Sequence, residues 1–119
     1  MNGWFVIVVA SGGAVGAMAR YGINTILARR FQASFPYGTL AVNVAGSFFL
    51  GWLIGSGIDE DWFYLLGVGF CGAFTTFSTF AYENMTMLRK RSYGVWLIYL
   101  CITFVGATFA AALGFGFAA

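Results

Sequence analysis

The sequence predicts an all-α membrane protein with four transmembrane helices in a single domain, residues 1–119. Hydrophobic residues make up 61% of the chain and charged residues only 8%, whereas a soluble domain carries about 25% charged residues. The apolar residues gather in four runs, and each run has the roughly 20 residues that a spanning helix needs. This composition excludes most soluble enzymes, and a net charge of +2 is too small for a surface that binds nucleic acid. The expected partner is the lipid bilayer.

The spans are expected at about residues 4–27, 37–58, 62–88 and 93–117. The short segments that separate them contain Arg29, Arg30 and Pro36, then Asp59, Glu60 and Asp61, then Arg89, Lys90 and Arg91. The first span has no basic segment before it, and more membrane sequence follows it, so we expect no cleaved signal peptide. Aromatic residues at several span ends fit the aromatic belts of the two membrane interfaces.

Glycines are placed where helices could approach closely. Gly12, Gly13 and Gly16 lie in the first span, and Gly51 and Gly55 lie four apart in the second. Small residues at this spacing let helix backbones pack together in lipid. The favoured interpretation is packing within one four-helix bundle, with a contact between subunits as the alternative. Because four helices enclose little space, an aqueous path through so small a protein is expected at a subunit interface.

Polar residues follow one face of the second span. Thr39, Asn43 and Ser47 are four residues apart, so they lie along one side of a helix. Asn43 can donate two N–H groups without a charge to desolvate. Tyr99 and Thr103 have the same spacing in the fourth span. We predict a hydrated stripe on the second span, although a single serine or threonine in a span often bonds only its own helix carbonyl.

The third span contains the most informative segment, from Gly69 to Phe80. Its glycines and β-branched threonines are unfavourable in an uninterrupted helix, so we predict a break near Gly72–Thr76, close to the middle of the membrane. A break frees backbone carbonyls, which suit a small cation, and transporters place ion sites at such breaks. The edges of the Phe77 and Phe80 rings can face an anion, although ordinary apolar packing is the alternative role for both.

Two charged residues lie within the apolar runs. Arg20 is expected near the end of the first span, where its long side chain can reach the interface. Glu83 lies deeper, and we expect it to be paired, protonated or facing water, with a hydrogen bond between helices as the structural alternative. The chain has no histidine, no nucleotide-binding loop and no paired carboxylates in a span, and Cys71 and Cys101 are far apart in sequence. We therefore do not expect an enzyme.

At the third span the chain resembles the small fluoride channels called Fluc or CrcB. The resemblance covers essentially the whole length. It rests on the motifs Gly12-Gly13-Ala14-x-Gly16-x-x-x-Arg20-Tyr21, Gly38-Thr39-Leu40-x-x-Asn43 and Gly72-Ala73-Phe74-Thr75-Thr76-Phe77-Ser78-Thr79-Phe80, followed by Glu83. It implies an antiparallel dimer with two pores in the bacterial plasma membrane. The function that it implies is a passive channel that releases fluoride from the cytoplasm and so lowers fluoride toxicity.

The resemblance also implies roles for individual residues. Phe77 and Phe80 would be the pore phenylalanines and Asn43 the pore amide. Gly72 and Thr75 would supply carbonyls to a structural sodium ion at the dimer interface. Thr79, Tyr99 and Thr103 match a polar track along the pore, and Arg20 and Glu83 match further positions of the family pattern. The next track position is Ala107 here, which lacks the hydroxyl.

Two other functions compete with the channel. Small multidrug transporters are also short four-span dimers, but they exchange protons for cations through an acidic residue in the first span. The only charged residue in this first span is Arg20. The third possibility is a membrane assembly subunit that transports nothing, and only the segment rich in phenylalanine and threonine argues against it.

The loop charges predict one preferred orientation. The first and third loops carry all the basic residues outside the spans, and the second loop carries Asp59, Glu60 and Asp61. Because short basic loops stay in the cytoplasm, we expect both termini outside. An antiparallel dimer would then need a partner whose loop charges favour the opposite orientation, such as a paralogue. The resemblance favours a homodimer, so both partners remain open.

Overall fold

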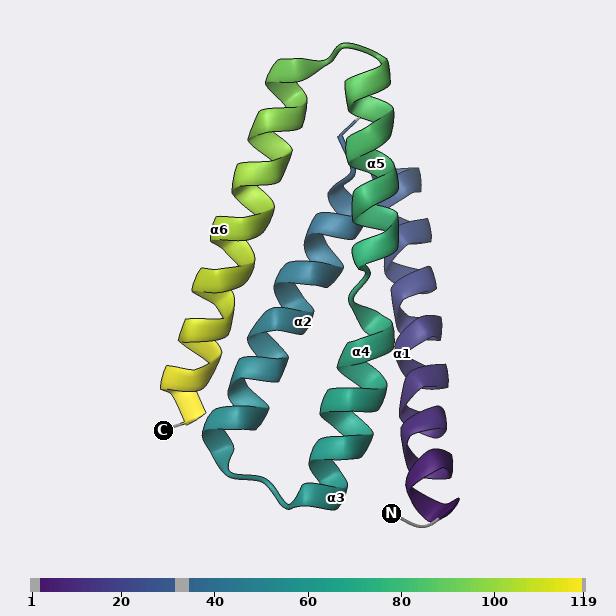
Figure 1. The fold of residues 1–119 in the computed structure, drawn as a ribbon, viewed down its shortest axis with the longest axis vertical. Coiled ribbons are helices and arrows are strands. Elements are labelled where there is room, and N and C mark those ends of the chain that lie inside the picture. Colours follow the sequence, from purple (N-terminus) through teal and green to yellow (C-terminus); the bar gives the residue numbers. More distant parts are fainter. Residues whose placement is uncertain (1–2, 32–34, 119) are drawn as a thin grey trace.

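The computed structural model describes residues 3–31 and 35–118, and helices are the only regular secondary structure in these residues. It contains four helical spans that are long and apolar enough to cross a membrane, which confirms the predicted fold class. They are α1 (Gly3–Arg30), α2 (Tyr37–Ser56), the composite third span (Glu60–Arg89) and α6 (Tyr93–Ala118). The spans run alternately up and down, so both termini lie at the same end as the connection between α2 and α3 (Figure 1).

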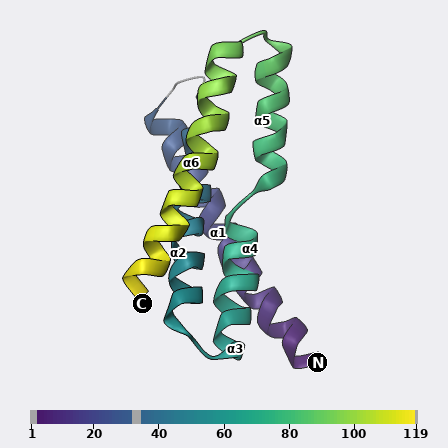
Figure 2. The ribbon, with the colours of Figure 1, turned by 60° about the vertical axis from the view of Figure 1, so that its left-hand side comes forward.

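The third span consists of four helical pieces. It begins with α3 (Glu60–Phe63) and continues as a π-helix, η1 (Tyr64–Cys71), and then as α4 (Gly72–Phe74) and α5 (Phe77–Arg89). Between α4 and α5 the backbone is extended, with φ −78° and ψ 158° at Thr75 and φ −145° and ψ 116° at Thr76. The predicted break is confirmed, and it is visible as the thin link between α4 and α5 (Figure 2).

Glycines let the helices pack in pairs. A Cβ atom on Gly12 or Gly16 of α1 would collide with a backbone carbonyl oxygen of η1. On the other side of the bundle, a Cβ atom on Gly51 of α2 would collide with the Ala111 carbonyl oxygen of α6, and one on Gly114 would collide with that of Phe48. Helix backbones approach this closely only where one of them lacks a side chain. The glycines predicted to pack within the bundle do so.

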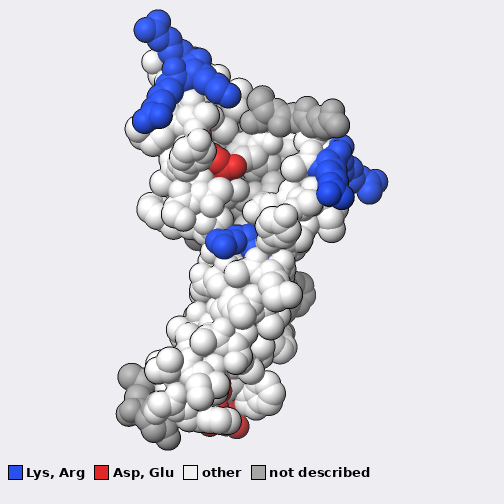
Figure 3. Space-filling view, turned by 90° about the vertical axis from the view of Figure 1, so that its right-hand side faces the viewer, with Lys and Arg blue, Asp and Glu red and all other residues white. Residues whose placement is uncertain are grey.

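Large apolar side chains cover the outside of the bundle. Phe104, Phe109 and Ile98 of α6 are exposed, as expected for a surface that faces lipid. The small buried cluster of Phe80, Met87 and Tyr99 lies where α5 meets α6. Most basic side chains concentrate toward one end of the molecule, and acidic side chains lie both at the other end and among the basic ones (Figure 3).

Candidate functional site

A pair of hydrogen bonds holds the break in the third span against α2. The Thr76 N–H donates to Asn43 Oδ1 at 2.9 Å, and Asn43 Nδ2 donates to the Thr76 carbonyl oxygen at 3.3 Å. The side-chain oxygen of Asn43 thus replaces the helical acceptor that the Thr76 N–H has lost. One Nδ2 hydrogen is used in this contact, which leaves the second for a ligand.

The break also frees the backbone carbonyl groups that precede it, from Gly72 to Thr75. In a continuous helix the Thr76 N–H would donate to the Gly72 carbonyl, but it donates to Asn43 instead. The Thr79 N–H would donate to the Thr75 carbonyl, but it donates to the hydroxyl of Thr76 at 3.2 Å, which caps the start of α5. Gly72 and Thr75, the residues expected to bind a cation, are therefore among the residues whose carbonyls have lost their helical donors. No other atom lies within 4 Å of the Cβ position of Gly72, so the space beside it is open.

A pocket of about 350 Å³ lies beside the break, between α2, the third span and α6. Seven of the predicted site residues line it: Asn43, Ser47, Gly72, Thr75, Phe77, Phe80 and Thr103. Every side chain that lines this pocket is uncharged. Ala107 also lines it, so the expected gap in the polar track falls on the wall of this pocket.

Two features of this pocket suit a small anion. The Thr103 side chain is only 7% exposed, and its hydroxyl has no partner within the described part of the chain. It is therefore available to donate to a ligand in the pocket. Phe80 is also buried, whereas Phe77 is 78% exposed, although their ring centroids are only 6.4 Å apart. The ring of Phe77 thus extends from the protomer surface.

The remaining polar residues form a second group nearer the basic end. The Tyr99 hydroxyl donates to the Glu83 carboxylate at 3.1 Å, and the buried Thr39 hydroxyl lies within reach of both. Thr39, Thr79 and Glu83 line a separate pocket of about 380 Å³, together with Asn24 of α1. The structural alternative for Glu83, a hydrogen bond between helices, is thus realised. Tyr99 connects the two groups, because its ring lies 5.2 Å from that of Phe80.

Arg20 lies well inside α1. It is half-buried, and α1 continues for ten residues beyond it to Arg30. At about 1.5 Å per residue, this places Arg20 about 15 Å from the end of the helix. The helix continues through Arg29 and Arg30, whose charges the sequence analysis places in the first loop. Arg20 is not among the residues that line the two pockets.

Comparison with known proteins identifies the family. The model described as "CrcB-like protein, Camphor Resistance (CrcB)" matches residues 7–115. The chain belongs to the CrcB family. A relative from Geobacillus kaustophilus, named "Fluoride-specific ion channel FluC 1", is 48% identical over 107 residues, which cover 90% of this chain and 91% of the relative. A relative from Bacillus cereus, "Fluoride-specific ion channel FluC 2", is 43% identical over 108 residues, which cover 91% and 92%.

This CrcB protein uses one residue at the break whose role had not been predicted. Thr76 was noted only as part of the segment rich in threonine, yet it caps α5 and binds Asn43. A sequence signal existed, because threonine is a favoured residue immediately before a helix and a helical segment was expected to restart here. The partnership with Asn43 had no such signal, because it joins residues 33 positions apart.

Proposed function

We propose that this chain forms a passive, fluoride-selective ion channel that exports fluoride from the cytoplasm and so lowers its toxicity. The observation that carries the proposal is the uncharged pocket beside the break, where amide, hydroxyl and phenylalanine groups meet. The names of the relatives, which describe them as fluoride-specific ion channels, support the same conclusion.

The chemistry of the pocket suits fluoride. Fluoride is small and gives up its water reluctantly, so a pore must replace that water with other donors. Asn43 has an N–H to spare and Thr103 an unpartnered hydroxyl, and Phe77 and Phe80 can offer the positive edges of their rings. A fixed cation would bind the ion tightly, whereas several weak neutral contacts allow it to leave, as conduction requires.

We further propose that the working unit is an antiparallel dimer. Phe77 is 78% exposed, and Gly72 is exposed beside the freed carbonyls. Backbone without helical hydrogen bonds is tolerated at membrane depth only when protein covers it or when it lines a water-filled cavity. A second subunit would cover this face and complete the wall of the pocket around Phe77.

The freed carbonyls fit a structural sodium ion at that dimer interface. Gly72 and Thr75 of each subunit would contribute two carbonyl oxygens, so a dimer would offer four neutral ligands. Unwound backbone carbonyls of broken membrane helices are a known kind of sodium ligand. The ion would supply positive charge at the junction of the subunits without being transported.

The direct test of function is fluoride efflux from liposomes. The purified protein is reconstituted, a fluoride gradient is imposed, and efflux is followed with a fluoride-selective electrode. Rapid fluoride efflux without chloride efflux is expected, and protein-free liposomes give the background leak. Proton-coupled uptake of an aromatic cation would instead support the small multidrug transporter, and a lack of any transport would leave the assembly subunit.

The identity of the second subunit depends on orientation. The basic loops favour the cytoplasm, so this chain is expected to insert with its termini outside and to pair with a paralogue of opposite bias. A single cysteine at Asn2, which lies outside the described residues, can be labelled in whole cells after Cys71 and Cys101 are replaced. Labelling from outside alone supports the fixed orientation, whereas equal labelling from both sides supports a homodimer of dual topology.

A further inference from the structure

A polar stripe runs along α5 from the break to the basic end of the molecule. It consists of Thr76, Thr79, Glu83, Thr86 and Lys90, at successive spacings of three, four, three and four residues. Side chains at this spacing lie on one face of a helix, and the mean step of about 3.5 residues keeps the stripe nearly straight.

Three pockets follow this stripe in order. Thr76 lines the pocket beside the break, and Thr79 and Glu83 line the second pocket. Glu83, Thr86 and Lys90 line a third pocket of about 160 Å³, which Ser92 also lines. Glu83 is shared by the second and third pockets, so these two pockets adjoin, and Thr79 lies one helical turn from Thr76 in the first pocket.

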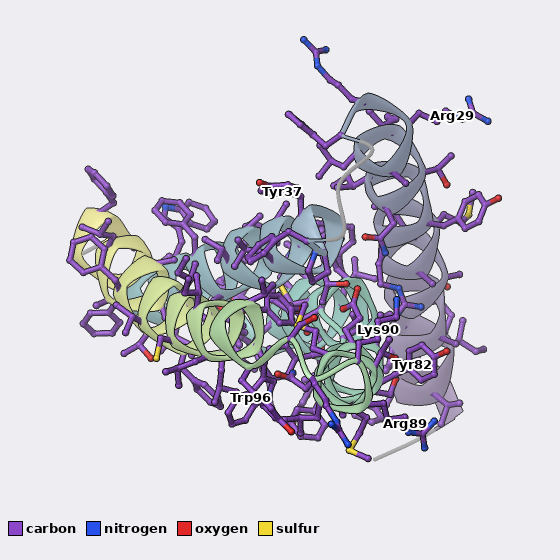
Figure 4. The ribbon with its side chains drawn as sticks, turned by 90° about the horizontal axis from the view of Figure 1, so that it is seen from above. Arg29, Tyr37, Tyr82, Arg89, Lys90 and Trp96 are labelled. Atoms are coloured by element: carbon purple, nitrogen blue, oxygen red, sulfur yellow. The ribbon has the colours of Figure 1, made fainter. Side chains whose placement is uncertain are left out.

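We propose that the anion path continues past Glu83 along this stripe and that Lys90 forms its cationic entrance at the basic end. The inference rests on the proposed channel function. Lys90 lies toward the middle of the bundle and Arg89 lies toward its outer edge when the molecule is seen from the basic end (Figure 4). Arg89 is not among the residues that line the third pocket, so the two neighbouring cations differ in position but not in charge.

The charges along the stripe explain why a cation is needed at this point. Glu83 would repel an approaching anion, although its carboxylate already accepts a hydrogen bond from Tyr99. The Thr86 hydroxyl donates to the Tyr82 carbonyl at 3.0 Å, so its hydrogen is not available to an anion. Lys90 has three ammonium donors and the only positive charge that lines this pocket. Its attraction offsets the repulsion of Glu83 at the entrance, where fluoride is still largely hydrated.

The turn between α5 and α6 holds Lys90 at this entrance. Its N–H continues the helix by donating to the Thr86 carbonyl at 3.0 Å. The chain then reverses through Arg91, whose φ of 58° is left-handed, and the N–H of Ser92 donates to the Met87 carbonyl at 2.9 Å. This is the Schellman pattern that closes a helix end, and it fixes the backbone from which the lysine side chain extends.

The test changes the charge at this one position. Lys90→Gln is compared with Arg89→Gln in the liposome efflux assay, with fluoride as the ion and an impermeant salt to set ionic strength. At about 10 mM ionic strength we expect Lys90→Gln to lower the initial efflux rate roughly threefold and Arg89→Gln to leave it almost unchanged. At about 1 M, where charges are screened within about 3 Å, the two variants should converge on the unmodified protein.

A second variant separates charge from folding. Lys90→Cys, in a background without Cys71 and Cys101, is reacted before reconstitution with a positively or a negatively charged thiosulfonate. The positive adduct should restore the rate and the negative adduct should lower it below that of the unreacted cysteine. Equal efflux rates for all three charge states at position 90 would overturn the proposal that Lys90 forms the entrance. An equal loss of rate in Arg89→Gln would overturn it too. In both cases, fluoride efflux by the unmodified protein would still support the channel. Absent fluoride efflux in the unmodified protein would overturn the proposed function itself.

Discussion

The two halves of the third span are built in different ways. The first half, η1 and α4, lies against α1 so closely that glycines replace side chains at the contact. The second half, α5 with its capping residue Thr76, lines three pockets. Thr75 and Thr76 join the halves in an extended conformation. One span thus combines a half that is held by close backbone contact with a half that lines pockets, and the Thr76 cap and the pair with Asn43 mark where the second half begins.

The largest expected effect comes from disrupting the close contact between α1 and η1. Gly16→Ala places a Cβ atom against the Phe70 carbonyl oxygen, which is backbone and cannot move aside alone. We expect a loss of about 3 kcal/mol in stability, measured as thermal unfolding of the purified protein in detergent. Gly22→Ala is the matched control on the same helix.

Gly22 has no other atom within 4 Å of its Cβ position. The same substitution there should stabilise α1 by about 0.5–1 kcal/mol, because alanine favours a helix more than glycine does. Opposite signs at the two glycines would show that contact, and not helix propensity, decides the result. If both variants were stabilised, α1 and η1 could not be packed as closely as described.

The second prediction concerns the junction between the halves. If the carbonyls of Gly72 and Thr75 bind sodium in a dimer, sodium should stabilise that dimer by mass action. The gain should reach about 2.7 kcal/mol at a concentration 100 times the dissociation constant. Thermal stability is measured against sodium concentration, with a bulky organic cation keeping the ionic strength constant. Identical unfolding curves at every sodium concentration would count against the site.

How far the sequence alone reaches differs between these two halves. The four spans were predictable because apolar runs of sufficient length have few alternatives, and glycine and threonine marked the break. The π-helix was not predictable, because the apolar pattern of Tyr64–Cys71 is the same whether each N–H donates to the carbonyl four or five residues before it. Close contact with α1 became visible only once the two helices were placed together.

The polar residues show a second limit. Thr39, Asn43 and Ser47 were assigned to one helical face, but each step of four residues turns the helix about 40° too far. Thr39 and Ser47 therefore point about 80° apart, and they line different pockets. Spacing identified the right residue types on α2, but which neighbouring helix each residue faces depends on tertiary packing.

The third prediction concerns the two phenylalanines at the start of α5. Phe80→Ile and Phe77→Ile keep the apolar character but remove the ring edge, so each should lower fluoride flux about tenfold while dimer yield falls much less. Flux is measured by the efflux assay and yield by size-exclusion chromatography. Phe109→Ile is a suitable control, because this exposed phenylalanine of α6 does not line the pocket beside the break. Full fluoride flux in both pore variants would remove these rings from the pathway.

The smallest expected effect comes from Thr76, the residue that caps α5. Thr76→Ala removes the hydroxyl that accepts from the Thr79 N–H at 3.2 Å, and loss of such a cap costs about 1 kcal/mol. The backbone pair with Asn43 does not use the hydroxyl and should persist. Thr76→Ser keeps the hydroxyl and should restore the stability measured by thermal unfolding. If serine were no better than alanine, the cap would not contribute, and the pair with Asn43 alone would have to set the point at which α5 begins.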